Sequence, residues 1–214
     1  MTRKREERRM CTRFYIEPES DELRELLEEA KRSRLGDLFM RGGSQVLTSG
    51  EIRPTSVVPV LASGKNRSAG VFPMRWGFQI PGGSLVVNAR CETAAVKPTF
   101  RDAWRGHRCV IPASWYYEWE HGKTPSGRTK TGDKYAIQPR GERTAWLCGL
   151  YRMENGFPVF AVLTREPTPY LRNIHDRMPL ILPKSRIHEW ISPDVRPETL
   201  LQYAVTELIA EKAV

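Results

Sequence analysis

The sequence has no long hydrophobic run and few cysteines, and each absence excludes a class of protein. No apolar segment approaches the roughly 20 residues of a membrane-spanning helix, and the mean hydropathy is −0.50. The N-terminus, MTRKREERRM, is basic with no apolar stretch behind it, so it is not a secretory signal. No pair among Cys11, Cys91, Cys109 and Cys148 has CxxC spacing. We therefore expect reduced thiols in a cytoplasmic protein.

Histidine is equally scarce, and this argues against a metal centre. The four histidines are His107, His121, His175 and His188. They have no partners at the spacing typical of metal ligands, so we predict no metal site. No other cofactor is expected.

Positive charge is what the sequence has in excess. The 214 residues include Lys+Arg 34 and Asp+Glu 25, which gives a net charge of +9 and an isoelectric point near 9.6. Residues 1–10 contribute +3, so the rest of the chain keeps +6. A basic protein favours a polyanionic partner, usually nucleic acid, although a merely soluble basic surface is the alternative.

Strand patterns dominate the chain, and helices flank them. Residues 1–9 have almost no apolar side chains, so we predict a disordered leader over 1–10 and a folded domain over 11–214. Strands are predicted at 11–16, 57–61, 71–78, 85–89, 109–118, 135–138, 145–151, 159–164 and 180–182. Helices are predicted from Ser20 to about Ala30 and at 98–105, 167–174, 185–191 and 197–211. This order predicts an α+β single domain with a curved, largely antiparallel β-sheet or barrel-like core and peripheral helices.

Three polar residues stand in apolar or aromatic surroundings. Asn88 ends the run LVVNAR, Glu118 lies between Tyr117 and Trp119, and His175 lies in NIHDRMPLIL. A carboxylate among aromatic rings is poorly solvated, which predicts a pKa raised toward neutrality. For that segment alone, a half-exposed strand with Glu118 facing water is the simpler interpretation. A lone histidine is also more often structural than catalytic.

Aromatic and basic residues occur in the same segments. Trp76 in MRWGF and the aromatic residues of 115–119 have faces on which nucleobases stack, although such residues more often pack in a core. If the fold brings these segments together, their cations form a phosphate-binding rim: Arg13, Arg75, Arg90, Lys97, Arg101, Arg172 and Arg177.

Five short motifs follow one another along the chain. They are Met10-Cys11-x-Arg13-Phe14, Arg75-Trp76-Gly77-Phe78, Asn88-Ala89-Arg90-x-Glu92-Thr93, Cys109-x-Ile111-Pro112-Ala113 running into Tyr117-Glu118-Trp119, and His175-Asp176-Arg177-Met178-Pro179. In this order and spacing they resemble the SOS response-associated peptidase (SRAP) family. Members of that family cross-link covalently to abasic sites in single-stranded DNA. The resemblance extends from Met10 to about Trp190.

The resemblance implies both catalytic and DNA-binding residues. It implies Cys11 as the nucleophile, with Asn88, Glu118 and His175 around it. It also implies DNA contacts at Arg13, Pro54, Trp76, Arg90, Lys97, Thr164 and Arg177. Thr12 stands where the family usually has glycine. Glu51-Ile52-Arg53-Pro54 keeps only the proline of the usual Asn-x-Ala-Pro segment.

The implied chemistry begins with the aldehyde of a ring-opened abasic site. The α-amine of an N-terminal cysteine forms a Schiff base, and its thiolate then closes a thiazolidine on the same carbon, which shields the lesion during the DNA damage response. Glu118 would act as a general acid and base, His175 would transfer protons, and Asn88 would orient the amine or the sugar. Because the amine must be free, the resemblance implies that residues 1–10 are absent from the active protein.

Two other functions stay open at this stage. One is a cysteine peptidase using Cys11, His175 and Asn88, which acts in trans or only on its own chain. Autopeptidase (hydrolase) and lyase-related chemistry could also accompany the cross-linking activity. The other is a non-catalytic module that binds single-stranded DNA. The expected partner is single-stranded DNA containing abasic sites, with no membrane and no metal. The protein is expected to be a monomer in the cytoplasm, associated with the nucleoid if the source is bacterial.

Overall fold

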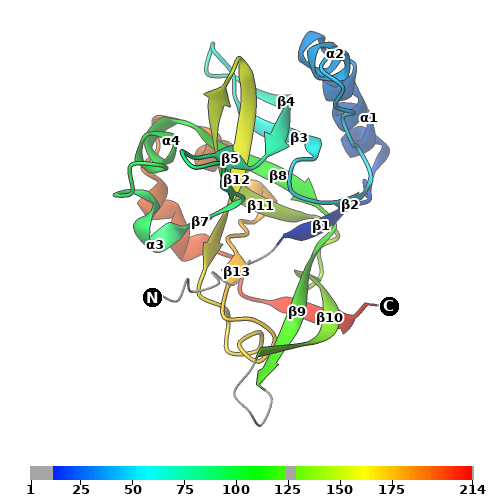
Figure 1. The fold of residues 1–214 in the computed structure, drawn as a ribbon, viewed down its shortest axis with the longest axis vertical. Helices are drawn as coiled ribbons and strands as arrows, with labels where there is room; N and C mark the ends of the chain where they lie inside the picture. The colour runs from blue at the N-terminus through cyan, green and yellow to red at the C-terminus, as the bar shows by residue number, and fades with distance from the viewer. Residues whose placement is uncertain (1–11, 124–128, 214) are drawn as a thin grey trace.

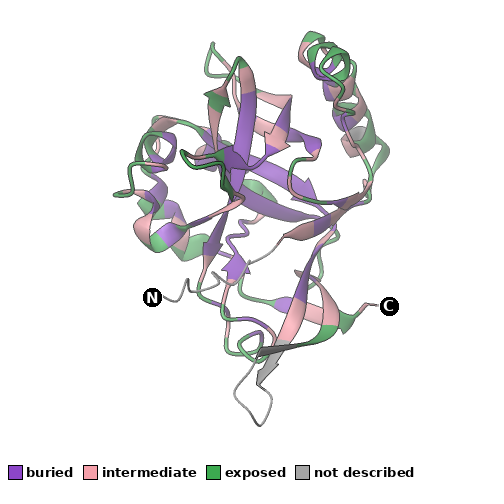
Figure 2. Ribbon diagram, viewed as in Figure 1, coloured by how far each residue is buried: buried purple, intermediate pink, exposed green. Residues whose placement is uncertain are grey.

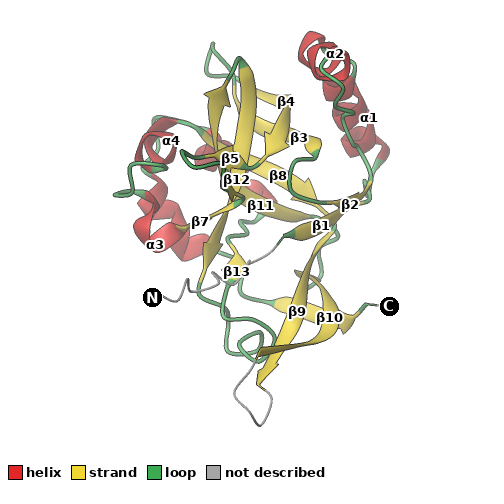
Figure 3. Cartoon of the chain, in the orientation of Figure 1, coloured by secondary structure: helices red, strands yellow, loops and turns green. Residues whose placement is uncertain are grey.

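The computed structural model describes residues 12–123 and 129–213 (Figure 1). It confirms the predicted α+β class, because strands form the centre and short helices lie at the periphery (Figure 3). No helix among the described residues is long and apolar enough to cross a membrane.

Five strands close into a barrel. In order around the ring they are β8 (Arg108–Ala113), β3 (Val57–Ser63), β4 (Ala69–Trp76), β12 (Phe157–Arg165) and β11 (Ala145–Glu154). The ring closes because β12 pairs with both β4 and β11. The β4–β12 pair is parallel, and the other pairs of the ring are antiparallel.

The barrel strands are buried on both faces over most of their length, although the first half of β4 is exposed or half-buried. Along β12, Phe160 and Val162 belong to one core cluster, while Ala161 and Leu163 belong to a second cluster on the other face. Figure 2 shows these strands as the most continuously buried part of the molecule. Because most positions on both faces are shielded from water, the strands are apolar runs without strict alternation.

A second sheet packs beside the barrel. Its strands lie in the order β14 (Leu208–Lys212), β10 (Thr129–Pro139), β9 (Trp115–Lys123), β1 (Arg13–Ile16) and β2 (Gly50–Ile52). The single strand predicted over 109–118 is wrong, because the chain changes sheet at Ser114 between β8 and β9. The Ser114 hydroxyl accepts the Glu17 N–H at 2.8 Å and donates to the Glu17 carbonyl at 2.9 Å.

The helices are short and begin at identifiable caps. Ser20 caps α1 (Asp21–Lys31) by accepting the Leu23 N–H at 3.1 Å, as the sequence predicted. Ser33 caps α2 (Arg34–Arg41), a helix that was not predicted. The remaining helices are α3 (Cys91–Ala94), α4 (Arg101–Gly106), α5 (Ile187–Ile191) and the 3₁₀ segments η1 (Lys184–Arg186) and η2 (Pro197–Tyr203).

Further predicted elements differ from the observed ones. The strand predicted over 180–182 is wrong, because only Ile181 forms an isolated bridge, to Leu147. Residues 167–174 form turns instead of a helix. The helix predicted over 197–211 ends after one 3₁₀ segment, and its second half is β14, which covers the open edge of β10. The strand predicted over 85–89 is divided into β6 (Leu85–Val86) and β7 (Asn88–Arg90), and β6 pairs with β5 (Phe78–Gln79).

Candidate active site and DNA-binding surface

The end of β12 brings two of the sequence motifs together. On one side β7 runs parallel to it, with Asn88 opposite Val162 and Arg90 opposite Thr164. On the other side β13 (Met178–Pro179) runs antiparallel to it, with Pro179 opposite Thr164. The Asn88 motif and the His175 motif therefore flank the same strand end, although they lie far apart in the sequence (Figure 1).

Trp76 supports this arrangement from inside the core. Its side chain is 0% exposed, and its indole N–H donates to the Val87 carbonyl at 2.9 Å, directly before Asn88. The ring also stacks against Phe160. The prediction that Trp76 contacts DNA needs correction, because a ring with no exposed surface offers no face to a base. Trp76 instead fixes the start of β7.

Glu118 and His175 face each other in the interior. Glu118 lies on β9 and is 4% exposed, and His175 is 3% exposed. Their Oε2 and Nε2 atoms are 4.0 Å apart, which is ion-pair range but longer than a hydrogen bond. The interpretation in which Glu118 faces water is therefore wrong. The structure pairs two of the predicted catalytic residues.

The other ring nitrogen of His175 has two polar neighbours. The backbone N–H of Arg177 donates to Nδ1 at 3.1 Å, and Oδ1 of Asp176 lies 3.2 Å from the same atom. The two contacts fit different protonation states of the ring. When Nδ1 accepts from Arg177, the proton of the neutral ring is on Nε2, facing Glu118. When the ring is doubly protonated, Nδ1–H is directed to Asp176 instead.

Arg177 binds other protein groups through both of its terminal nitrogens. Its Nη1 and Nη2 atoms each donate to one oxygen of Glu92 at 2.8 Å, and Nη2 also donates to the Thr164 carbonyl at 2.8 Å. Its side chain is only 10% exposed. This paired geometry ties the His175 segment to α3 and β12. In this conformation both Nη atoms of Arg177 bind protein groups, whereas its buried Nε has no hydrogen-bond partner among the described residues.

Glu92 belongs to the Asn88 motif, but the sequence predicts no role for it. Partial burial opposes its ionisation, but the hydrogen bonds and charge of Arg177 outweigh this effect, so the pKa of Glu92 is lowered. Glu92 therefore forms an ion pair with Arg177. The sequence could not reveal this pairing, because the two residues lie far apart in the chain.

The other predicted DNA contacts differ in their accessibility. Arg90 and Lys97 are exposed, while Pro54 is half-buried at the corner of the turn 53–56. Thr164 is 0% exposed, and its hydroxyl donates to the Ala89 carbonyl at 3.4 Å. The Thr164 side chain therefore holds β7 in place, which corrects its predicted DNA contact.

Arg13 begins β1 and lies opposite Tyr117, the neighbour of Glu118. Because side chains alternate along a strand, Arg13 and Tyr117 lie on one face of this sheet and Glu118 on the other. The predicted nucleophile, Cys11, lies outside the described residues.

The three other cysteines are unsuited to nucleophilic chemistry. Cys91, Cys109 and Cys148 are buried free thiols. Burial, together with the charge of Glu92, raises the pKa of Cys91 to about 12, and burial raises the pKa values of Cys109 and Cys148 well above the ordinary range. Buried thiols with raised pKa values are unreactive. Within the described ranges, no three His, Cys, Asp or Glu side chains are placed to hold a metal ion.

Comparison with known proteins identifies the family. The sequence profile described as SOS response associated peptidase (SRAP) matches residues 10–213. The chain belongs to the SRAP family. The abasic site processing protein YoaM of Bacillus subtilis is 29% identical over 218 residues, covering 94% of this chain and 89% of the relative. The abasic site processing protein YobE of the same organism is 30% identical over 189 residues, covering 78% of this chain and 83% of the relative.

Solved structures share the SRAP fold seen here. A protein from Bacteroides thetaiotaomicron has a TM-score of 0.70 at 17% identity, covering 95% of this chain and 92% of that one. A phage-related protein from Bordetella bronchiseptica has a TM-score of 0.66 at 19% identity, covering 95% and 94%. At these identities the likeness concerns the fold alone.

Proposed function

We propose that this SRAP protein captures abasic sites in single-stranded DNA by forming a thiazolidine with Cys11. The observation that carries the proposal is the buried pair of Glu118, on β9, and His175. β9 pairs with β1, the strand that begins two residues after Cys11. Cys11 lies two positions before Arg13, with Thr12 between them, and two residues of extended chain span at most about 7 Å. The relatives YoaM and YobE are named abasic site processing proteins, which supports the same substrate.

The proposed reaction needs no cofactor, because its atoms balance with loss of one water. The α-amine of Cys11 adds to the aldehyde carbon of the ring-opened sugar, and the resulting hydroxyl leaves as water to give a Schiff base. The thiolate then attacks the same carbon, the C=N bond becomes a single bond, and its nitrogen takes up a proton. Ring closure removes the C=N bond, which otherwise acidifies the neighbouring sugar proton and promotes strand cleavage.

In this proposal Glu118 acts as the general acid and base, and His175 transfers protons to and from it. Glu118 donates a proton to the departing hydroxyl and accepts one from the amine. His175 presents Nε2 toward Glu118 while Nδ1 is held by the Arg177 N–H, so it can return the proton to the carboxylate. Asn88, on β7 beside the end of β12, hydrogen-bonds and orients the sugar or the amine.

The proposed amine chemistry requires that the active chain begin at Cys11. An amide nitrogen is not nucleophilic because its lone pair is delocalised. Either the Met10–Cys11 bond is cleaved by the protein itself, or translation begins at Met10 and that methionine is removed. We favour the second route. Expression of the full reading frame with Met10→Leu distinguishes the two routes. Only self-cleavage would still yield a protein with the intact mass of a chain that begins at Cys11.

The test of the proposal is adduct formation with an abasic single-stranded oligonucleotide. We expect a covalent adduct that survives denaturing electrophoresis and has the intact mass of protein plus DNA minus one water. Cys11→Ser keeps the amine and loses the thiol, so it should give only a labile Schiff base that borohydride traps. An equally heat-stable adduct with Cys11→Ser would falsify the thiazolidine mechanism. Blocking the α-amine while sparing the thiol should abolish the adduct, whereas peptidase activity in trans would survive.

A further inference from the structure

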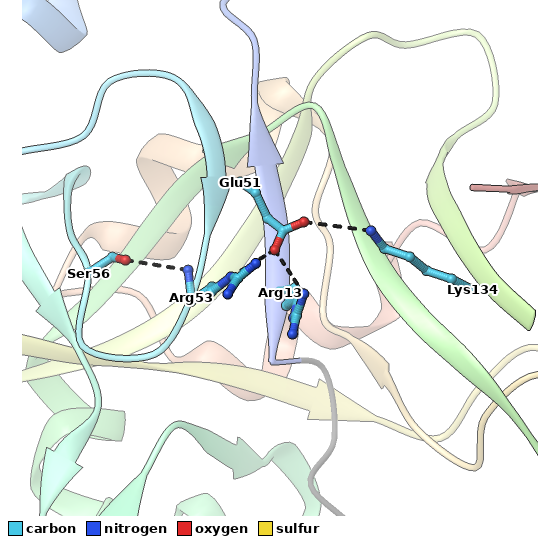
Figure 4. Close-up of polar contacts among 5 residues, drawn as sticks. All are labelled: Arg13, Glu51, Arg53, Ser56 and Lys134. Atoms are coloured by element: carbon cyan, nitrogen blue, oxygen red, sulfur yellow. Dashed lines mark hydrogen bonds and ion pairs between the residues drawn. The ribbon is translucent and has the colours of Figure 1, made fainter. Parts of the chain in front are cut away.

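Three cationic side chains converge on one carboxylate at the edge of the second sheet (Figure 4). Nη1 of Arg13 lies 3.0 Å and Nε of Arg53 2.8 Å from Oε1 of Glu51. Nζ of Lys134 lies 3.6 Å from Oε2 of the same carboxylate. We call Arg13, Arg53 and Lys134 the cation cluster. With Glu51 included, three positive charges face one negative charge, so the group retains a net charge of +2.

The cations are held by aromatic rings as well as by Glu51. The guanidinium of Arg13 lies over the Trp119 ring, 5.2 Å from its centroid. Nζ of Lys134 lies over the Tyr117 ring, 3.9 Å from its centroid. Cation–π contacts of this kind do not depend on Glu51. Arg13 and Lys134 therefore each have one contact that does not involve the carboxylate.

Arg53 is positioned by a preformed turn. The Ser56 N–H donates to the Arg53 carbonyl at 3.0 Å, and Thr55 has a φ of 77°. Positive φ is unfavourable for a β-branched residue and persists only where surrounding contacts enforce it. Trp76 supplies such contacts, because its carbonyl accepts the Thr55 N–H at 2.8 Å and its N–H donates to the Ser56 carbonyl at 2.9 Å. The strained turn presents Arg53 from a rigid base.

Glu51 is ionised within the cluster but only partly covered by it. Partial burial opposes ionisation, but the hydrogen bond from Arg53 and the charges of Arg13 and Lys134 outweigh it, so the pKa of Glu51 is lowered. Its side chain is 24% exposed. A carboxylate presents two oxygens to its partners, as the two non-bridging oxygens of a phosphodiester do. Glu51 thus occupies a site whose charge and geometry suit a phosphate.

We propose that the cation cluster binds one phosphodiester of single-stranded DNA, and that Glu51 fills this site in the free protein as an internal competitor. The inference rests on the proposed function for the identity of the strand. Tyr117 lies on the cluster's face and Glu118 on the opposite face, so the phosphate is one that flanks the lesion and not the reacting sugar. Glu51 weakens the non-covalent binding of undamaged single-stranded DNA. The preference for abasic over undamaged DNA then depends more on covalent capture.

The decisive variant is Glu51→Gln, which keeps the shape of the side chain and removes its charge. We expect it to bind an intact, non-abasic single-stranded oligonucleotide about 5–10-fold more tightly than the wild type in fluorescence anisotropy. Asp194→Asn is the matched control, because it also removes one carboxylate charge paired with an arginine, Arg67, at an exposed site. The proposal is overturned if Glu51→Gln binds the oligonucleotide no more tightly than the wild type. It is also overturned if Asp194→Asn gains as much affinity as Glu51→Gln.

Arg53→Ala provides a second test that does not depend on the folding of the Glu51 variant. The Arg53 side chain is 63% exposed, so its removal leaves the core intact. We expect weaker binding of the intact oligonucleotide and a shallower salt dependence, by about 0.7 in the log–log slope for one lost phosphate contact. The combined Glu51→Gln and Arg53→Ala variant should lose most of the gain from Glu51→Gln. Wild-type affinity and salt slope in Arg53→Ala would contradict the site.

The two proposals fail in distinguishable ways. Wild-type cross-linking to abasic DNA combined with unchanged binding by Glu51→Gln removes the cation cluster proposal and leaves covalent capture intact. Tighter binding of intact DNA by Glu51→Gln, without any covalent adduct in the wild type, supports the phosphate site and removes the proposed function.

Discussion

Nε2 of His175 lies 4.0 Å from Oε2 of Glu118, and both side chains are almost completely buried. Burying an ionisable pair is costly, and a buried pair is weak evidence for a purely stabilising role. The proposed chemistry supplies a reason for it, because a general acid and a proton carrier must be adjacent and shielded from bulk water.

Glu118→Gln should slow covalent capture without weakening DNA binding. Removing a general acid and base usually costs about 100-fold or more in rate, and the amide keeps the size of the side chain. The measurement is a single-turnover time course of adduct formation, together with the affinity for an intact oligonucleotide. Glu120→Gln, a carboxylate two positions along β9, is the matched control and should react at the wild-type rate. An unchanged rate in Glu118→Gln would remove this residue from the mechanism.

Glu92→Gln should make the stability of the protein less dependent on acid pH. The folded-state pKa of Glu92 is lowered, so its ionic contribution is complete above the unfolded value of about 4.3 and is lost as pH falls through the lower folded value. The variant should therefore be less stable than the wild type at neutral pH, and the difference should shrink with acidification. Denaturant unfolding at a series of pH values measures it. A difference that grows on acidification would contradict the assigned ion pair with Arg177.

Trp76→Phe should weaken the fold and slow cross-linking together. The substitution keeps an aromatic ring but deletes the N–H donated to the Val87 carbonyl, which also accepts the Val162 N–H at 3.0 Å. The loss of one such bond should cost about 1 kcal/mol of unfolding free energy. The reaction should slow because Asn88 follows Val87. If Trp76 acted by stacking on DNA instead, the variant would lose DNA affinity while keeping wild-type stability.

Thiol titration of the native protein should reveal one fast-reacting cysteine. Cys91, Cys109 and Cys148 are buried and their pKa values are raised, so they carry almost no thiolate at about pH 8. We assign the fast thiol to Cys11. An aromatic disulfide reagent measures the reaction, with the three buried thiols appearing only after denaturation. Cys11→Ser should remove the fast phase, and a fast phase that survives this substitution would point to another cysteine as the reactive thiol.

The sequence by itself determined the fold class and the family. Apolar strands separated by turns, without alternation of strands and helices, are sufficient for an α+β prediction because both signals are local. Five motifs in fixed order carried the family resemblance, and the family profile confirms it over residues 10–213. The cap of the first helix was also predictable, because Ser20 and the acidic residues after it act within one turn.

Secondary structure predicted from local sequence patterns was wrong where contacts with a distant part of the chain determine the conformation. The second half of the segment 197–211 has an acceptable helical pattern, but the open edge of β10 offers it unpaired backbone groups, and β14 forms there. The strand predicted over 109–118 is interrupted because Ser114 bonds to Glu17, far earlier in the chain. Neither partner is visible from within the segment itself.

Only the tertiary structure decided how the site is built. Strand register placed Glu118 and Tyr117 on opposite faces of β9, and the fold buries Glu118, whereas the segment around Glu118, taken alone, favoured a solvated carboxylate. The same register placed Lys134 opposite Trp119 and beside Glu51, forming a cation cluster that no local motif indicates. A sequence specifies which chemical groups are present. Whether a group is solvated, paired or stacked depends on which strands pair and in what register, since one residue of slip moves a side chain to the opposite face.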